Sequence, residues 1–484
     1  MAGQDGAFEF CPEHDVGTRR VTIENVRQFV VGVEQPAPLV DGRHAPYVNQ
    51  DNAATTPPFT LVLECSRRFF EWYASVHRGS GFKSLLSTHV YEKCRQIVAN
   101  FVGADLSHHT VIFTQNATHA LNKLAQRVCV REDHRVLTTL MEHHSNMLPW
   151  RRLGCAMDYV QVTGDGALDW GDFERKMRRH GGRVCLVAVT GASNVTGILP
   201  PIRRIARAAH ERGAMVALDA TQLVPHRPFA MGEPDDPERV DFVAFSGHKI
   251  YAPFGSGVLI GPRWVFEEGP PDAVGGGTVH AVTMDDVHWA PPPEKEEAGT
   301  PNVPGAIALA SAIRVLESIG MENVAAREYE LTRRALARLT RLEGLTLYGG
   351  TDPELREDRL GVIPLNAAGL GHGELAAILG HEWGIGVRNG CFCAQPYVRE
   401  LLGVSAAEMN DIVRRLAHGD HATVPGMVRA SFGVYNMPDE VDYLVEALSA
   451  ILADGARAHY VLDERYQDYV PDPPVVSLDD YAPL

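Results

Sequence analysis

Apolar segments of strand length alternate with stretches of helical periodicity from about residue 46 to about residue 300. The strands predicted from this pattern are 110–114, 135–140, 184–190, 214–218, 240–245 and 256–260. Helices are predicted between them, for example at 117–128 and 201–212. Near-continuous apolar strands that alternate with helices are typical of a mostly parallel sheet covered on both faces, so the predicted fold class is α/β. In such sheets, ligands bind beyond the carboxyl ends of the strands.

The pattern changes after a Pro- and Gly-rich loop region at 268–297. Helical periodicity then runs from about 304 to 342, and it is followed by a predicted strand at 361–366 and predicted helices at 372–381 and 439–453. This mixture predicts a smaller α+β domain. We therefore predict four parts, namely an N-terminal extension at 1–45, a large domain at 46–303, a small domain at 304–465 and a tail at 466–484.

The composition narrows the class of protein. A formal net charge of −16 argues against binding to nucleic acid or to an anionic membrane surface. No apolar run has membrane-spanning length, and the first residues lack the features of a signal peptide, so a cytoplasmic location is predicted. The eight cysteines are scattered except for Cys391 and Cys393, which predicts free thiols. A lone Cys-x-Cys is weak evidence for a metal, and no metal site is predicted.

Two of the predicted strands lead into residues that can carry chemistry. The strand at 240–245 runs into a turn that holds Ser246, His248 and Lys249, and the strand at 214–218 ends on Asp219. A lysine that forms a Schiff base and a carboxylate that pairs with a pyridinium nitrogen are what pyridoxal 5'-phosphate (PLP) chemistry needs. A surface lysine would account for an isolated Ser-Gly-His-Lys, but the aspartate 30 residues upstream favours a cofactor role.

The turn at 114–118 joins a predicted strand to a helix that begins near Thr118. Free N–H groups and the helix dipole make such a terminus suited to phosphate. Threonine is also a common helix N-cap, so the turn alone leaves both interpretations open.

Seven further segments occur in the order found in one enzyme family. They are Asp-Asn-Ala-Ala-Thr-Thr-Pro at 51–57, Val-His-Arg-Gly at 76–79, Met-Glu-His-His-Ser-Asn at 141–146, Ser-Asn-Val-Thr-Gly at 193–197, Ala-Gly-Thr-Pro-Asn at 298–302, Arg-Asn-Gly-Cys-Phe-Cys-Ala-Gln-Pro at 388–396 and Arg-Ala-Ser-Phe at 429–432. On these motifs the chain resembles, over about residues 47–455, the class V (fold type I) PLP-dependent aminotransferases, and within them the group II cysteine desulfurases and selenocysteine lyases. The resemblance implies PLP as cofactor, a homodimer, and a large seven-stranded, mostly parallel sheet domain with a smaller α+β C-terminal domain.

The resemblance also implies roles for individual residues. The residues implied at the cofactor phosphate are Ala117, Thr118, Ser246, His248 and, reaching the other subunit's cofactor, Thr300. The residues implied at the cofactor ring are His143, which stacks on it, Asn194, Asp219 at the ring nitrogen, Gln222 at the phenolic oxygen and Lys249. The residues implied at the substrate are Ala53, His77, Asn194, Arg388 and Arg429. The planar fork of arginine suits a carboxylate.

Cys393 is the predicted sulfur nucleophile, because the loop at 388–396 resembles the family's catalytic-cysteine loop. The chain departs from the family there, since Cys391 and Phe392 stand where histidines are usual. The stretch from Cys393 to Arg429 is also longer than in the family. The additional residues predict a helix with a capping box at Ser405-Ala406-Ala407-Glu408, with the apolar positions Met409, Ile412, Val413 and Leu416 and a stop at Gly419.

The predicted function is removal of sulfur from L-cysteine, with Lys249 moving the Cα proton, Cys393 taking the sulfur as a persulfide, and a protein or small molecule accepting it afterwards. One alternative is another PLP enzyme of this fold, a C–S lyase on a cysteine conjugate or a transaminase or epimerase, for which Cys393 is dispensable. The other is a non-catalytic scaffold that binds a partner.

Overall fold

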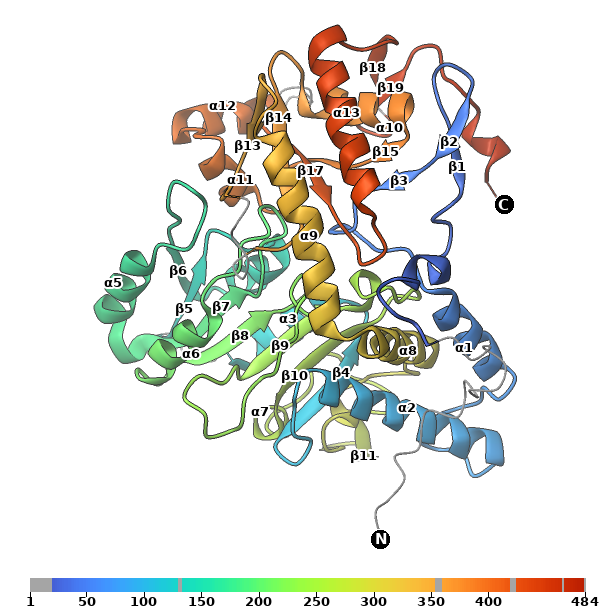
Figure 1. Ribbon diagram of the computed structural model, residues 1–484. Helices are drawn as coiled ribbons and strands as arrows, with labels where there is room; N and C mark the ends of the chain where they lie inside the picture. Colours follow the sequence, from blue (N-terminus) through green and yellow to red (C-terminus); the bar gives the residue numbers. More distant parts are fainter. Residues whose placement is uncertain (1–19, 129–132, 353–358, 418–423, 464, 483–484) are drawn as a thin grey trace.

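The computed structural model describes residues 20–128, 133–352, 359–417, 424–463 and 465–482. A seven-stranded sheet forms the larger half, with the strand order β4-β10-β9-β8-β7-β5-β6 (Figure 1). Strand β10 pairs antiparallel with β4 and β9, and the other neighbours are parallel. The bounds are β4 His109–Thr114, β5 Arg135–Thr139, β6 Ala156–Val160, β7 Val184–Thr190, β8 Met215–Asp219, β9 Phe242–Ser246 and β10 Gly257–Pro262. The predicted mostly parallel α/β sheet is confirmed.

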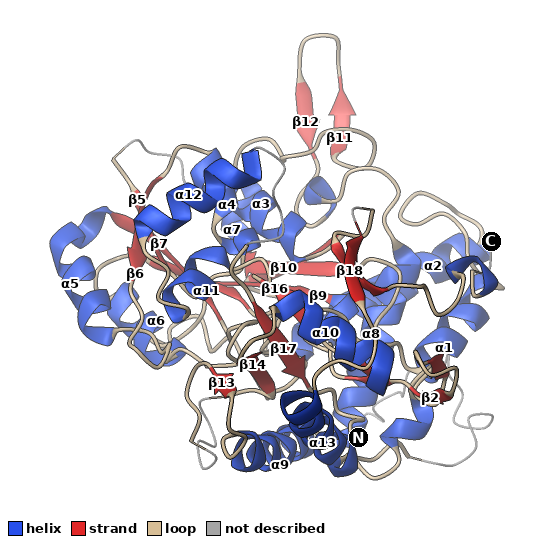
Figure 2. Cartoon of the chain, turned by 90° about the horizontal axis from the view of Figure 1, so that it is seen from above, coloured by secondary structure: helices blue, strands red, loops and turns tan. Residues whose placement is uncertain are grey.

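Helices cover both faces of this sheet. Successive strand residues point to opposite sides, and in the central strands both sets are apolar, so both faces need to be covered. In β7, Leu186 and Ala188 pack in the apolar cluster that holds α3, whereas Val187 and Val189 pack in the cluster that holds α1, α2, α6 and α8. Helix α5 flanks the β6 end of the sheet (Figure 2). The bounds are α1 Thr60–Phe70, α2 Phe82–Phe101, α3 Ala117–Val128, α4 Leu148–Arg152, α5 Trp170–His180, α6 Ile202–His210, α7 Arg263–Glu267 and α8 Val303–Ile319.

The smaller half is built on a four-stranded antiparallel sheet of order β13-β14-β17-β16. Helices α9, α10 and α13 share one apolar cluster with it. The strand bounds are β13 Leu345–Leu347, β14 Val362–Ala367, β16 Arg388–Gly390 and β17 Met427–Ser431. The helix bounds are α9 Met321–Leu339, α10 His372–Trp383, α11 Gln395–Leu401, α12 Ala406–Ala417 and α13 Pro438–Asp454.

Within the described residues, four short strand pairs lie outside the two sheets. Strand β3 pairs parallel with β15, and the other three pairs are antiparallel. The pair β11–β12 projects from the body of the molecule (Figure 2). The bounds are β1 Pro36–Pro38, β2 His44–Pro46, β3 Val48–Asn49, β15 Ile385–Gly386, β11 Val279–Val282, β12 Val287–Trp289, β18 Tyr460–Asp463 and β19 Asp468–Pro471.

The helix predicted between Cys393 and Arg429 is confirmed as α12. Its capping box forms, since the Glu408 N–H donates to Ser405 Oγ at 3.2 Å and the Ser405 N–H donates to Glu408 Oε2 at 2.8 Å. The predicted stop at Gly419 lies outside the described residues. The helical run predicted from 304 to 342 is two helices, because Gly320 separates α8 from α9 with φ +87°. The predicted domain boundaries stay predictions.

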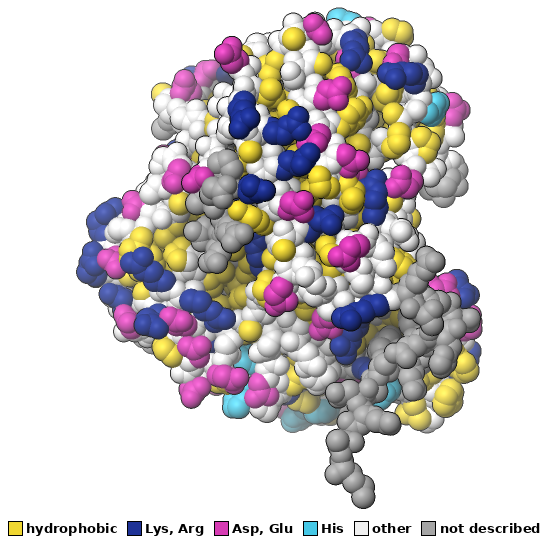
Figure 3. All heavy atoms as spheres, viewed as in Figure 1, with side chains coloured by type: hydrophobic (Ala, Val, Ile, Leu, Met, Phe, Trp, Pro, Cys, Tyr) yellow, Lys and Arg dark blue, Asp and Glu magenta, His cyan; other side chains and the backbone are white. Residues whose placement is uncertain are grey.

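No single helix within the described ranges is long and apolar enough to cross a membrane. The pair α8 and α9 meets that length and composition only when taken together, and it is bent by 76°. On the described part of the face in Figure 3, acidic and basic side chains lie interspersed.

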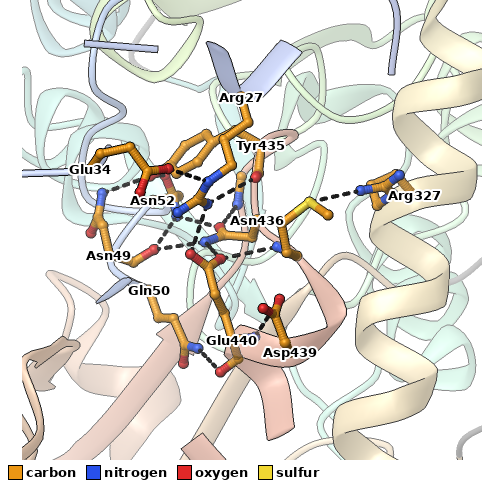
Figure 4. Close-up of polar contacts among 12 residues, drawn as sticks. Arg27, Glu34, Asn49, Gln50, Asn52, Arg327, Tyr435, Asn436, Asp439 and Glu440 are labelled. Atoms are coloured by element: carbon orange, nitrogen blue, oxygen red, sulfur yellow. Dashed lines mark hydrogen bonds and ion pairs between the residues drawn. The ribbon is translucent and has the colours of Figure 1, made fainter. Parts of the chain in front are cut away.

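A buried polar network ties the N-terminal extension to the start of α13 (Figure 4). Glu440 Oε1 accepts from Arg27 Nη1 at 2.8 Å, and Glu440 Oε2 accepts from Asn436 Nδ2 at 2.7 Å and from the Met437 N–H at 3.0 Å. Burying a carboxylate is costly unless it is paired and hydrogen-bonded, and here both oxygens are used. Glu440 therefore joins the extension to the small half.

The same network continues to the segment after β3. Asn52 Nδ2 donates to Asn436 Oδ1 at 3.1 Å, and the Tyr435 hydroxyl donates to Asn52 Oδ1 at 2.8 Å (Figure 4). Tyr435 also accepts from Asn49 Nδ2 at 2.9 Å. These bonds fix the chain on either side of Asp51, which enters the site described below.

We predict that Glu440→Ala lowers the free energy of unfolding by about 2 kcal/mol, because Arg27 and the start of α13 lose a charged acceptor. Urea unfolding of the two proteins measures the difference. Glu446→Ala is the matched control, since Glu446 is exposed on the same helix, and it is expected to change stability by no more than about 0.5 kcal/mol. Equal unfolding midpoints for the two variants would contradict the role given to Glu440.

Candidate active site

A cavity of about 270 Å³ lies where the parallel strands β7, β8 and β9 end and the small sheet begins. It brings together residues that are as far apart in the chain as Ala53 and Arg429. The predicted site residues that line it are Ala53, Ala117, Thr118, His143, Asn194, Asp219, Gln222, Ser246, His248, Lys249, Arg388, Cys393 and Arg429. His77 and Thr300 are the predicted residues that do not line it.

Lys249 enters the cavity from a short 3₁₀ turn, Gly247–Lys249, at the end of β9. A side chain at Gly247 would place its Cβ 2.3 Å from Ser256 Oγ and 3.1 Å from the Ser256 carbonyl oxygen, so glycine permits this close approach. Burial and the positive charge of Arg429 lower the pKa of Lys249 to about 8, although Asp219 opposes the shift. A substantial fraction of this amine is therefore neutral and nucleophilic near physiological pH.

Asp219 is the last residue of β8 and is buried. Its Oδ1 accepts from the Thr221 N–H at 3.1 Å, so the carboxylate is held at the cavity wall. Nearby Gln222 is also buried and donates through Nε2 to the Ala53 carbonyl at 2.8 Å.

The amino end of α3 forms another wall. Asn116 Oδ1 accepts from the His119 N–H at 2.9 Å, and Ser246 Oγ accepts from the Ala117 N–H at 2.8 Å. The Thr118 hydroxyl lies 2.7 Å from Ser145 Oγ. Hydroxyl groups thus surround a helix amino terminus whose dipole favours an anion.

His143 follows β5 and faces the same cavity. Its Nδ1 accepts from the Ser145 N–H at 3.1 Å. Burial lowers the pKa of His143 to about 4, although Asp219 opposes the shift, so the ring is neutral at pH 7. Because Nδ1 is an acceptor, the ring proton belongs on Nε2.

Arg429 joins the two halves across the cavity. Its Nη2 donates to Asp51 Oδ1 at 3.0 Å, and its Nη1 donates to the Asn194 carbonyl at 2.9 Å. The buried Nε has no hydrogen-bond partner, so the guanidinium keeps a donor for a further group. Asp51 was not among the predicted site residues; the only signal for it was its place at the start of the 51–57 motif.

Cys393 is exposed and lies in an unusual loop conformation. Phe392 and Cys393 have φ values of +51° and +54°, a left-handed region that non-glycine residues rarely adopt. Asn194 Nδ2 donates to the Phe392 carbonyl at 2.6 Å, and the His144 N–H donates to the Cys393 carbonyl at 2.7 Å. These two bonds hold the strained loop, and His144 is a structural contributor that sequence reasoning did not assign to this loop.

Cys391 differs from Cys393 in its surroundings. Its Sγ donates to the Pro425 carbonyl at 3.1 Å, and burial raises the pKa of the thiol to about 11. A thiol with that pKa is almost wholly protonated at neutral pH, and the thiolate is the reactive form. Cys393 is thus the better placed of the two as a nucleophile.

His77 and Thr300 belong to a different part of the surface. His77 has φ +68° and lines a separate cavity of about 270 Å³, which also contains Gly299 and Pro301. Thr300 between them is exposed. Their predicted roles at the substrate and at the other subunit's cofactor stay predictions.

The residues of the main cavity fit PLP. A lysine amine, a buried carboxylate and a hydroxyl-lined helix terminus supply the groups that its aldehyde, ring nitrogen and phosphate require. Thr221 Oγ1, on a residue lining the cavity, is buried without a hydrogen-bond partner and can serve a bound group. Within the described ranges, no group of three or more His, Cys, Asp or Glu side chains could hold a metal ion.

Comparisons with known proteins agree with this geometry. A "Probable cysteine desulfurase" of Streptomyces coelicolor is 36% identical over 423 residues, covering 85% of this chain and 93% of that protein. A "Cysteine desulfurase" of Haloferax volcanii is 34% identical over 418 residues, covering 85% and 90% of the two proteins.

Solved structures of cysteine desulfurases also match most of this chain. The apo cysteine desulfurase of Thermococcus onnurineus NA1 matches with a TM-score of 0.77 and 31% identity, covering 90% of this chain and 99% of that one. The Escherichia coli cysteine desulfurase CsdA, in its S-sulfonic acid form, matches with a TM-score of 0.73 and 27% identity, covering 89% and 98%. The family model for class-V aminotransferases matches residues 48–444. The family resemblance drawn from the motifs is therefore confirmed, and the chain belongs to the class-V aminotransferase family.

Proposed function

We propose that this protein is a PLP-dependent cysteine desulfurase that converts L-cysteine to L-alanine and takes the sulfur onto Cys393. The observation that carries the proposal is the placement of an exposed Cys393 thiol in the same cavity as the Lys249 amine and the Arg429 guanidinium. The relatives and solved structures that bear the name cysteine desulfurase support it.

When bound, PLP supplies an electron sink that lets a substrate amino acid lose its Cα proton. Lys249 would hold the cofactor covalently through Nζ, and its freed amine would take the Cα proton and return it. Asp219 would keep a proton on the ring nitrogen, while neutral His143 would lie over the ring with its Nε2 proton available. The hydroxyls of Ser246 and Thr118, with His248, would bind the phosphate.

The substrate carboxylate would bind at Arg429, whose Nε is free for it, with Arg388 beside the cavity mouth. Arg429 already donates to Asp51 and to the Asn194 carbonyl, so its plane is fixed before substrate arrives. Preorganised donors of this kind save the entropy of ordering at binding.

Sulfur transfer would then use the Cys393 thiolate as the nucleophile, and the electron sink described above would stabilise the electron pair left on the substrate. The thiolate attacks the substrate sulfur, a new S–S bond forms on Cys393, and the substrate Cβ–S bond breaks with its electron pair left on carbon. A proton added at Cβ completes alanine. The sum is cysteine plus an enzyme thiol giving alanine plus an enzyme persulfide, which balances without an external oxidant.

We also propose a cytoplasmic homodimer in which Thr300 reaches the cofactor of the other subunit, and a sulfur acceptor, protein or small molecule, that removes the persulfide sulfur. The exposure of Thr300 supports its proposed contact with the other subunit. The four-part division at residues 45, 303 and 465 remains part of this proposal. Light scattering during size-exclusion chromatography tests the dimer, and a mass of one chain for the cofactor-loaded protein would contradict it.

We predict that the rate at which PLP loads onto the cofactor-free protein rises with pH and is half-maximal near pH 8. Only the neutral amine condenses with an aldehyde, and a lysine whose pKa is lowered to about 8 becomes neutral above that pH. Stopped-flow absorbance of the bound cofactor measures the rate. Lys249→Ala is the control and should give no covalent cofactor, and a half-maximal rate near pH 10 in the parent protein would contradict the assignment.

We predict that Cys393→Ser lowers alanine formation from L-cysteine by at least about a hundredfold, because serine's hydroxyl cannot replace a thiolate as a sulfur nucleophile. Binding of cysteine to the cofactor-loaded protein should persist, since Lys249, Asp219 and Arg429 are unchanged. Chromatographic assay of alanine, sulfide and pyruvate gives the rate and the product class.

Cys391→Ser is the matched control and should keep alanine formation within about threefold of the parent rate, because its thiol is half-buried and protonated. Sulfide and pyruvate released at the parental rate by Cys393→Ser would instead identify a C–S lyase.

A further inference from the structure

The C-terminal β18–β19 hairpin, Tyr460–Asp463 with Asp468–Pro471, lies outside the segment that the family model matches, which ends at residue 444. In two perpendicular views it lies beside α10, in the half that holds the small sheet (Figures 1 and 2). The sequence alone assigned no role to this segment. Its contacts lead directly to the loop that carries Cys393.

A buried carboxylate docks the hairpin onto α10. Glu382 Oε1 accepts from the Arg457 N–H at 2.7 Å, from the Ala458 N–H at 3.1 Å and from the Tyr460 hydroxyl at 3.2 Å. The Arg457 guanidinium also lies over the Trp383 ring, 4.5 Å from its centroid. These three hydrogen bonds to one buried carboxylate fix the position of the chain where the hairpin begins.

The amino end of α10 is shaped to receive the other strand. A Cβ at Gly373 would stand 3.0 Å from Tyr469 Cδ2 and 3.8 Å from Asn389 Oδ1, so glycine permits the close approach of β19. The hairpin is therefore packed against the helix at both ends and is not a loosely attached tail.

The hairpin reaches the active-site loop through one side chain. Asn389 Nδ2 donates to both carboxylate oxygens of Asp468, at 3.3 and 3.2 Å, and Asn389 Oδ1 lies 3.2 Å from His372 Nδ1. Asn389 stands between Arg388, at the cavity mouth, and Gly390, after which the Cys391–Cys393 loop begins. The nitrogen and the oxygen of the Asn389 side-chain amide thus both contact groups outside strand β16.

This contact matters because of where Asn389 lies in the sheet. Strand β16 is the edge strand, and among the described residues its backbone pairs only with β17. An edge strand with one partner is restrained on one side alone. The side-chain bond to Asp468 adds a restraint to this strand at Asn389, shortly before the strained conformation of Phe392 and Cys393.

We propose that the C-terminal hairpin is a positioning element of the active site, in which Asp468 holds Asn389 and thereby sets the loop from Arg388 to Cys393. Asp468 and Asn389 are positioning residues, since neither lines the cavity. The proposal rests on the proposed function in naming Cys393 as the sulfur acceptor. The geometric coupling between the hairpin and the loop can be measured without turnover.

The test is an exchange of the two side chains in the full-length, cofactor-loaded protein. Asp468→Asn weakens the contact by removing the charge, and Asn389→Asp sets two carboxylates against each other. The double variant Asn389→Asp/Asp468→Asn restores one amide and one carboxylate in the reverse order. Asp472→Asn is the matched control, because Asp472 follows the same hairpin and lies within 3.9 Å of His459.

Two measurements report on the loop directly, namely hydrogen exchange of the peptide 388–395 and the rate at which iodoacetamide alkylates Cys393. We expect Asn389→Asp to change both by about tenfold, Asp468→Asn to change them less, and the double variant to return within about twofold of the parent, as coupled polar neighbours do. The steady-state rate should follow the same order in kcat, with the amount of bound cofactor unchanged.

The coupling would be overturned if the double variant were no better than Asn389→Asp, or if both single variants matched Asp472→Asn. A fall in melting temperature without a change in loop exchange would also overturn it, because it would make the contact merely structural. If Cys393 proves dispensable for alanine formation, the exchange and alkylation data still decide the positioning claim, so the two failures are distinguishable.

Discussion

The buried Arg429 guanidinium is the constraint on which the site depends, because it connects the two sheets across the cavity. It donates to Asp51 after β3 and to the carbonyl of Asn194 after β7, while its own strand β17 lies in the small sheet. Burial raises the pKa of the Asp51 carboxyl, and the charge of Arg429 opposes that shift. Burying such a pair is worth little in stability, so its value lies in fixing one relative position of the two halves.

The same guanidinium is linked to the loop that carries Cys393. It lies 4.8 Å from the centroid of the Phe392 ring, and Asn194, whose carbonyl it binds, donates to the Phe392 carbonyl. A left-handed conformation at two successive non-glycine residues costs free energy and persists only where surrounding contacts determine it. The guanidinium that we propose binds the substrate carboxylate and the thiol that we propose accepts the sulfur are therefore held by one connected set of contacts.

Much of the large sheet and most of the site could be predicted from the sequence, because buried parallel strands are apolar throughout and end on the residues that carry chemistry. Strand β6 was missed, since it is the edge strand and holds a polar Asp158 among half-buried positions. The break at Gly320 was missed because helical periodicity continues on both sides of it. The pairing of Asp51 with Arg429 and the docking of the hairpin at Asn389 join residues about 380 and 80 positions apart, and local pattern carries no record of such contacts.

The central claim, that Cys393 receives the sulfur, is tested most directly by mass spectrometry of the protein after a single turnover with L-cysteine. Rapid alkylation followed by trypsin isolates the peptide that contains both Cys391 and Cys393. The account predicts one additional sulfur atom on this peptide, placed by fragment ions on Cys393, in an amount equal to the alanine formed. Alanine formed without sulfur on Cys393, or sulfur found on Cys391 in its place, would contradict it.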